Sequence, residues 1–181
     1  MPFDVNQFRS NMIQDGARPN LFEVFLTFPT LIVPEGIIAG ERTRFLAKAS
    51  QLPGSTIGMV PLYYFGREAK FAGNRTFADW TLTIINDEDF FIKNALERWS
   101  NGINSNASNV RDFAALSPLG YTVDADVVQY GKDGIIKKQY TFVGMFPVDI
   151  APIDLDWGSN DTIEEYTVTF AYQWWESNTT S

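Results

Sequence analysis

Strict alternation of large apolar side chains with small or polar ones over residues 165–174 constrains the fold of this chain more than any other feature. One set of positions holds Tyr166, Val168, Phe170, Tyr172 and Trp174, and the other holds Glu165, Thr167, Thr169, Ala171 and Gln173. Because successive side chains of a strand point to opposite faces, one face is expected to be buried and the other exposed. This pattern is typical of an antiparallel sheet with one face packed on a core.

Further strands are expected over residues 21–28, 43–50, 80–85, 121–130 and 135–146, and residues 131–134 have the composition of a hairpin turn. A loop is expected over 29–40. A single helix is expected over 87–100, with Asn86 or Asp87 as its cap, Trp99 on its apolar face and Gly102 at its end. The predicted class is mainly β (α+β), an antiparallel barrel or sandwich of about seven strands with one flanking helix.

The 181 residues fit a single domain, 1–181, with three appendages. Residues 1–16 are expected to form an N-terminal arm with a weak helical stripe. Residues 57–73 are expected to form an extended hairpin arm, in which an apolar run over 61–65 is followed by a turn at 66–68 and a return over 69–71. Residues 177–181 are expected to form a polar tail. The N-terminal stripe consists of Phe3, Val5, Phe8, Met12 and Ile13.

Composition excludes several classes of function. The chain has no cysteine and no histidine, which removes disulfides, thiolate and imidazole metal sites, and cysteine- or histidine-dependent catalysis. Its net charge of −8 disfavours tight binding to nucleic acid. No segment has the pattern of a signal peptide or a membrane span, so we expect cytoplasmic synthesis and no membrane insertion. No phosphate-binding loop is present, and no cofactor is expected.

Carboxylate pairs are the remaining candidates for catalysis. Asp124 with Asp126, or Glu164 with Glu165, would suit glycoside hydrolysis without histidine, and the first pair would be about 7 Å apart on one strand face. A solvated acidic face is the favoured interpretation. Asp154 and Glu165 have the spacing of a calcium loop, but Ser159 stands where glycine is required, so no metal site is predicted.

Two aromatic runs are candidates for binding. Trp174–Trp175 and Tyr63–Phe65 would suit stacking on bases or sugars, but the acidic charge argues against bases. Contact with protein is the favoured interpretation of the aromatic arm.

An ordered set of segments resembles one family. The segments are 17–24, 48–58, 72–88, 146–148, 154–157 and 175–176, and the most specific are Gly-Asn-Arg-Thr-Phe-Ala-Asp-Trp-Thr from 73 and Leu-Asp-Trp-Gly-Ser-Asn from 155. Together they resemble the major tail tube proteins of contractile-tailed, T-even-like phages. The loop over 29–41 and the tail after Glu176 depart from the family pattern.

The resemblance implies a β-barrel or sandwich subunit with a flanking helix. It implies rings of six copies, stacked into a tube inside a contractile sheath, with the tape measure protein and then DNA in the lumen. Baseplate and tail terminator proteins are the further expected partners. The location implied is the virion tail, after assembly in the host cytoplasm. DNA would pass without specific binding, since −8 per copy gives −48 per ring of six.

The sequence therefore predicts a non-enzymatic, self-assembling tube subunit. Candidate subunit and ring contacts lie in the arm, at Met59, Tyr63, Tyr64, Phe65 and Arg67. Asp124 and Asp126 are the candidate lumen-facing residues. The alternatives are a tube protein of a bacterial contractile injection or secretion system, and a tail-associated carboxylate glycoside hydrolase, which would need a cleft holding a carboxyl group of raised pKa.

Overall fold

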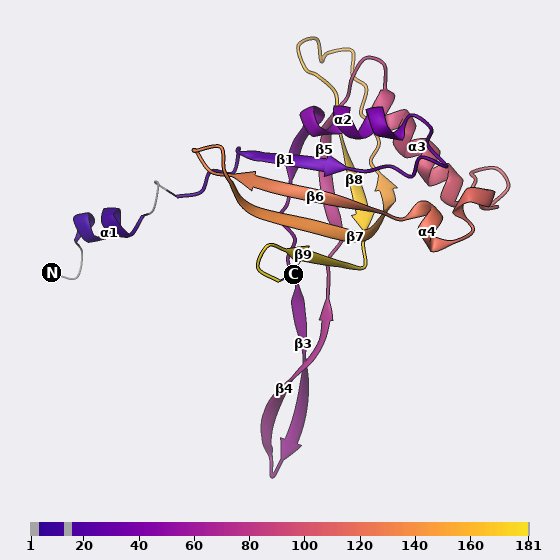
Figure 1. Ribbon diagram of the computed structural model, residues 1–181. Coiled ribbons are helices and arrows are strands. Elements are labelled where there is room, and N and C mark those ends of the chain that lie inside the picture. The colour runs from indigo at the N-terminus through magenta and orange to yellow at the C-terminus, as the bar shows by residue number, and fades with distance from the viewer. Residues whose placement is uncertain (1–3, 13–15, 181) are drawn as a thin grey trace.

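The computed structural model describes residues 4–12 and 16–180, which form a sheet, several helices and a projecting hairpin (Figure 1). The helices are α1 (Val5–Asn11), α2 (Gly36–Leu46), α3 (Phe91–Ile103), the 3₁₀ turn η2 (Phe113–Ala115) and α4 (Pro118–Tyr121). The strands are β1 (Phe22–Leu26), β2 (Ala47–Ser50), β3 (Thr56–Tyr64), β4 (Arg67–Thr76), β5 (Trp80–Ile85), β6 (Val123–Tyr130), β7 (Ile136–Ile150), β8 (Glu165–Ala171) and β9 (Trp174–Ser177).

Seven strands form one antiparallel sheet in the order β1-β6-β7-β8-β5-β2, with β9 also paired to β7. The mainly β prediction is therefore confirmed, and so is the hairpin between β6 and β7. Strands β3 and β4 form a separate two-stranded sheet, which projects away from the rest of the molecule (Figure 1).

The seven-stranded sheet has two halves, one formed by β1, β6, β7 and β9 and the other by β2, β5, β7 and β8. Strand β7 belongs to both halves. Its first part pairs with β6 and β9, whereas the part from Phe146 to Ile150 pairs with β8. Gly144 lies between the two parts and has a φ of 64°, in the left-handed region that favours glycine. A bulge in the pairing lies opposite, between Val123 and Ala125. The chain thus passes from one half of the sheet to the other at Gly144.

Aromatic side chains join the inner faces of the two halves. The Trp80 ring, from β5, stacks on Phe142 of β7 at 4.6 Å between centroids and contacts Phe170 of β8 at 5.5 Å. Trp99 of α3 is fully buried between Phe28 and Phe170, and its indole N–H donates to the carbonyl of Tyr121 at 2.8 Å. The core therefore lies between the two halves of the sheet, under α3.

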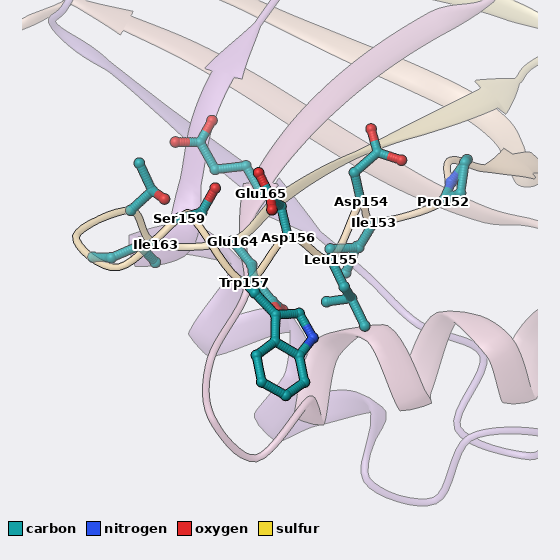
Figure 2. Close-up of a pocket in the computed structure, with 11 residues that line it drawn as sticks. Pro152, Ile153, Asp154, Leu155, Asp156, Trp157, Ser159, Ile163, Glu164 and Glu165 are labelled. Carbon is teal, nitrogen blue, oxygen red and sulfur yellow. The ribbon is translucent and has the colours of Figure 1, made fainter.

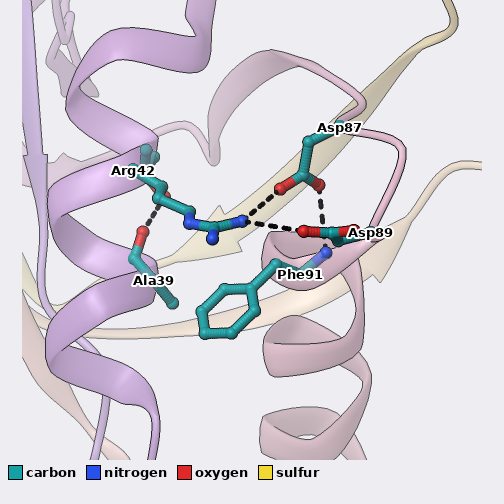
Figure 3. Close-up of polar contacts among 6 residues, drawn as sticks. Ala39, Arg42, Asp87, Asp89 and Phe91 are labelled. Carbon is teal, nitrogen blue, oxygen red and sulfur yellow. Dashed lines mark hydrogen bonds and ion pairs between the residues drawn. The ribbon is translucent and has the colours of Figure 1, made fainter.

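Helix α3 carries the predicted apolar face, but its ends differ from the prediction of 87–100. Asp87 precedes the helix, and its carboxylate accepts a hydrogen bond from the backbone N–H of Phe91 at 3.0 Å (Figure 3). Gly102 lies inside the helix. Only glycine fits at this position, because a Cβ would be 2.4 Å from Cγ2 of Ile32. The glycine permits close packing and does not end the helix.

The expectation of one helix, a loop over 29–40 and a strand over 43–50 was wrong. Residues 36–46 form α2, and only Ala47–Ser50 form a strand. The apolar residues of α2 are spread around the helix, so they give no amphipathic signal. Gly40 lets the helix pack closely on β1, because a Cβ there would lie 2.6 Å from the carbonyl oxygen of Leu26.

Helices α2 and α3 are linked by polar contacts. The Arg42 guanidinium binds the Asp87 carboxylate at 2.9 Å, lies 3.7 Å from that of Asp89, and packs over the Phe91 ring (Figure 3).

The strand predicted over 165–174 divides into two. β8 ends at Ala171, and β9 begins at Trp174 and pairs with a different part of β7. The alternation changes phase across this break. As a result Trp174 is exposed, whereas Trp175 packs against the core.

Helix α1, which covers part of the predicted N-terminal arm, buries no side chain. Asp4 caps it, accepting from the backbone N–H of Asn6 at 2.9 Å. Two residues of the predicted stripe, Phe3 and Ile13, lie outside the described residues, as does Ser181 of the predicted polar tail.

Replacing Trp99 tests the core. The change Trp99→Ala should lower the free energy of unfolding by about 3–5 kcal/mol, because it removes a fully buried indole and leaves a cavity. Urea denaturation of the monomer measures the loss. The control Leu119→Ala, at a side chain that is 89% exposed, should change stability by less than about 0.5 kcal/mol. Equal effects of the two changes would contradict this description of the core.

Candidate assembly surfaces

The chain exposes more surface than a compact monomer of its mass. Its accessible area is 12559 Å². A compact monomer of 20.5 kDa is expected to expose about 8,900 Å². The excess reflects the projecting elements, and many of their exposed side chains are large and apolar. Such surface is typical of a protein that binds partners.

The β3–β4 hairpin is the largest of these projecting elements. Every residue of β3 is exposed, and so is every residue of β4 except Gly73, which is half-buried. Apolar residues occupy both faces of β3, with Met59 and Tyr63 on one and Val60 and Leu62 on the other. Apolar residues on both faces of a strand are typical of strands covered on both sides. A two-stranded hairpin alone is marginally stable in water, so this element needs a partner.

The tip of the hairpin is a two-residue turn at Phe65 and Gly66. Both have positive φ, 47° and 79°, the geometry of turns that match the twist of a hairpin. The sequence analysis placed this turn one residue later, at 66–68. Phe65 is a bulky residue in a region that disfavours side chains, and its ring is 90% exposed. The turn therefore presents an aromatic ring at the outermost point of the hairpin.

Two tryptophans anchor the base of the hairpin to the core. The indole N–H of Trp80 donates to the carbonyl of Gln51 at 3.0 Å, and that of Trp175 donates to the carbonyl of Gly54 at 3.1 Å. Phe77, just after β4, packs near Trp175. These anchors were not predicted, because both tryptophans follow the arm in the sequence and Trp175 lies about 100 residues beyond it.

The predicted lumen residues lie on the face of β6 opposite the buried Ala125 and Val127. Both carboxylates accept hydrogen bonds from β7. Asp124 accepts from the backbone N–H of Gly144 at 2.9 Å, and Asp126 accepts from the hydroxyl of Thr141. The two residues therefore share a face as predicted, and Asp124 also supports the bend in β7.

The other acidic pair of the sequence analysis, Glu164 and Glu165, contacts neighbouring polar side chains. Glu164 accepts a hydrogen bond from Asn86 at 2.9 Å, and Glu165 pairs with Lys48. In residues 4–12 and 16–180, no three carboxylates converge as a set of metal ligands. Among the same residues, no helix is both long and apolar enough to cross a lipid bilayer.

A polar cluster ties α2 to the edge of the sheet. Glu23 of β1 accepts from the Tyr130 hydroxyl at 2.6 Å and from the Arg44 guanidinium at 3.0 Å. The hydrogen bond from Tyr130, with a smaller contribution from Arg44, lowers the pKa of Glu23. The same hydrogen bond raises the pKa of Tyr130.

Two exposed apolar surfaces were missed by the sequence analysis. One lies on α2, at Ile37, Ile38 and Phe45. The other lies in the loop before β8, where Leu155, Trp157 and Ile163 are exposed. The apolar residues of α2 give no amphipathic pattern, and exposure of single residues in a loop has no periodic signal, so only the tertiary structure reveals these surfaces.

A family described as phage tail tube protein matches residues 17–178. The chain belongs to this tail tube family. The tail tube protein gp19 of Enterobacteria phage T4 is 32% identical over 163 residues, covering 90% of this chain and 92% of the relative. The tail tube protein of Serratia phage KSP90 is 27% identical and covers 93% of each chain. The predicted resemblance is confirmed.

Membership of the tail tube family identifies a structural protein of the virion tail, not an enzyme. The alternative of a carboxylate glycoside hydrolase is therefore set aside.

Solved structures agree in fold. A chain in the tube-terminating cap of the anti-feeding prophage superposes with a TM-score of 0.65 at 15% identity, covering 93% of this chain and 94% of that one. A chain of the extended sheath–tube complex of the extracellular contractile injection system PVC gives 0.60 at 13% identity, covering 97% and 98%.

Removing the Tyr130 hydroxyl tests the polar cluster. A carboxyl group whose pKa is lowered by folding stabilises the fold above its usual pKa of about 4.3, and this stabilisation is lost as the pH falls through the folded-state value. Tyr130→Phe removes the main cause of the lowering, so acid unfolding should begin at a higher pH. Circular dichroism during an acid titration measures this. Tyr140→Phe is the control, because the Tyr140 ring packs on Trp175 and its hydroxyl has no hydrogen bond to a described residue. An unchanged transition for Tyr130→Phe would contradict the prediction.

Proposed function

We propose that this chain is the tube subunit of a contractile phage tail and that subunits bind one another through the β3–β4 hairpin. Six copies form a ring, and rings stack into a tube. The observation that carries the proposal is the hairpin itself, which is apolar on both faces, exposed along its length and anchored only at its base. Binding to a neighbouring subunit would cover both its faces and its free strand edges.

The predicted contact residues are concentrated near the tip of the hairpin. Tyr63, Tyr64 and Phe65 are the most exposed aromatic residues in the arm, and the Tyr64 and Phe65 rings meet edge to face at 4.5 Å. Rigid aromatic side chains are frequent anchors of protein interfaces. Met59 and Arg67 would add apolar contact and a charged hydrogen-bond donor.

The remaining partners follow from the family. Tail sheath protein would surround the tube, baseplate and terminator proteins would cap its ends, and tape measure protein and then DNA would occupy its lumen. The fold similarity to a chain in an injection-system sheath–tube complex is compatible with a surrounding sheath. It is equally compatible with a tube that delivers protein cargo, the second candidate function. The 32% identity to the phage T4 protein favours the phage tail.

We infer that the subunit is a closed barrel in the ring and that the outer face of β6 lines the lumen. Helix α2 connects β1 and β2, the two ends of the sheet, and packs on β1. Asp124 and Asp126 would then present carboxylates to passing DNA. Their negative charge would oppose binding of phosphates and keep the lumen from retaining the genome.

Shortening the hairpin tests assembly. Deletion of residues 60–68 should leave a folded monomer that forms no tubes, because these residues contribute nothing to the buried core. Circular dichroism tests folding, and negative-stain electron microscopy, with a matching baseplate as template, tests assembly. The milder variant Tyr63→Ser/Tyr64→Ser/Phe65→Ser should behave in the same way. Its control, Tyr63→Phe/Tyr64→Phe, keeps the rings and should assemble normally. Normal tubes from the deletion variant would refute the proposal.

Neutralising the two aspartates tests the lumen. Asp124→Asn/Asp126→Asn keeps the acceptor oxygens bonded to Gly144 and Thr141 but removes two charges per copy. Tubes should assemble normally while genome ejection slows, because repulsion of the phosphates is weaker. Ejection from purified virions, followed by dye fluorescence, measures the rate. The matched control is Glu88→Gln/Glu97→Gln, which removes two charges from exposed side chains before and within α3. An unchanged ejection rate for the Asp124/Asp126 variant would show that the outer face of β6 does not line the lumen.

A further inference from the structure

The hairpin and the loop before β8 lie at opposite ends of the molecule. In Figure 1 the β3–β4 hairpin extends downward, whereas residues 151–164 form the yellow-orange loop at the top. With nine residues in β3, the hairpin spans about 30 Å, so its tip would meet the loop end of a copy placed beyond it in the same orientation. The two features can therefore meet between copies arranged head to tail.

The loop surrounds a cavity of about 460 Å³, lined by residues 152–157, 159 and 162–165. Leu155 and Trp157 extend from one side of the loop, and the carboxylates of Asp154 and Glu165 extend from the other (Figure 2). The Trp157 side chain is fully exposed, which is unfavourable for so large a ring in water. The loop thus offers apolar groups on one side and acidic groups on the other.

The charges of the loop and the hairpin are complementary. Residues 152–164 contain four acidic residues and no basic one, whereas residues 56–76 contain three basic residues and one acidic one. Asp154 of the loop and Arg67 and Lys70 of the hairpin have no ion pair with any described residue. In a chain with a net charge of −8, the hairpin is a basic exception.

We propose that the hairpin tip of one copy, residues 63–70, docks in the cavity formed by residues 152–165 of the next copy. Phe65 would pack against Trp157, and Arg67 and Lys70 would pair with the loop carboxylates. The inference rests on the proposed tube function and specifies its axial contact. Every copy gives a hairpin and receives one, so the contact is heterologous and propagates without closing, as a tube of unlimited length requires.

Cysteine crosslinking tests the docking directly. The chain has no cysteine, so Phe65→Cys/Trp157→Cys provides one possible pair. Oxidation of assembled tubes should give a ladder of dimers, trimers and longer chains on non-reducing gels, because each copy carries both partners. A disulfide forms only where the two Cα atoms approach within about 7 Å. The control Phe65→Cys/Ser108→Cys places the second thiol on another exposed loop and should give no ladder.

Charge reversal gives an independent measurement. Arg67→Glu/Lys70→Glu in the hairpin, or Asp154→Lys/Asp161→Lys in the loop, should each raise the critical concentration for tube growth by at least about tenfold, since like charges would face each other. Combining all four changes restores opposite charges and should return growth to within about threefold of the unmodified chain.

The outcomes separate this inference from the proposed function. A ladder specific to Trp157→Cys, together with rescue by the combined reversal, supports the docking. Normal tubes with no ladder, an equal ladder from Ser108→Cys, or no rescue would overturn the docking and leave the tube function standing. The docking would also be overturned if added sheath protein, and not tube assembly itself, protected the Trp157→Cys thiol from chemical modification. Failure of the unmodified chain to form rings or tubes on a baseplate would overturn both.

Discussion

The stacking of Trp80 on Phe142 is the interaction on which the rest of the structure depends. It joins β5 in one half of the sheet to β7 in the other, and the Phe170 ring beside it extends the contact toward Trp99 of α3. The same Trp80 donates its indole N–H to Gln51 at the base of the hairpin. One side chain therefore contacts both halves of the sheet and the segment that leads into the hairpin. Because such interiors are close-packed, a change at this position is expected to disturb both the domain and the base of the hairpin.

The apolar residues of this chain serve two different interiors. One is the core of the subunit, between the halves of the sheet. In the proposed tube the other would form between copies, because the hairpin, α2 and the loop before β8 all expose large apolar side chains. A monomer that exposes so much apolar surface is prone to associate. We interpret the acidic net charge as a second constraint on the same assembly, since it opposes adhesion to DNA while the basic hairpin remains attracted to acidic surfaces of other copies.

Much of the candidate site was predictable because its signals are local. The hairpin was found from a turn between two runs of extended, apolar residues, and Asp124 and Asp126 were placed on one face from the period of two along a strand. The anchors of the hairpin were not found, because Trp80, Trp175 and Gly54 are far apart in the sequence. Helix α2 was missed for a related reason. Glycines at 36 and 40 weaken a helix locally, yet they allow α2 to pack closely against Phe28 and Leu26.

The sequence by itself determined the fold class, the family and the absence of cysteine- or histidine-dependent chemistry, because periodicity, ordered motifs and composition need no knowledge of contacts. The tertiary structure alone decided where regular patterns change. β7 passes between the two halves of the sheet at Gly144, and the alternation of the last strand changes phase between Ala171 and Trp174, so that Trp175 packs on the core while Trp174 is exposed. The physical reason is that a bend or a phase change is stabilised by partners elsewhere in the chain, here Asp124 bonded to Gly144 and Val143 bonded to Gln173. Local side-chain patterns carry no information about such partners.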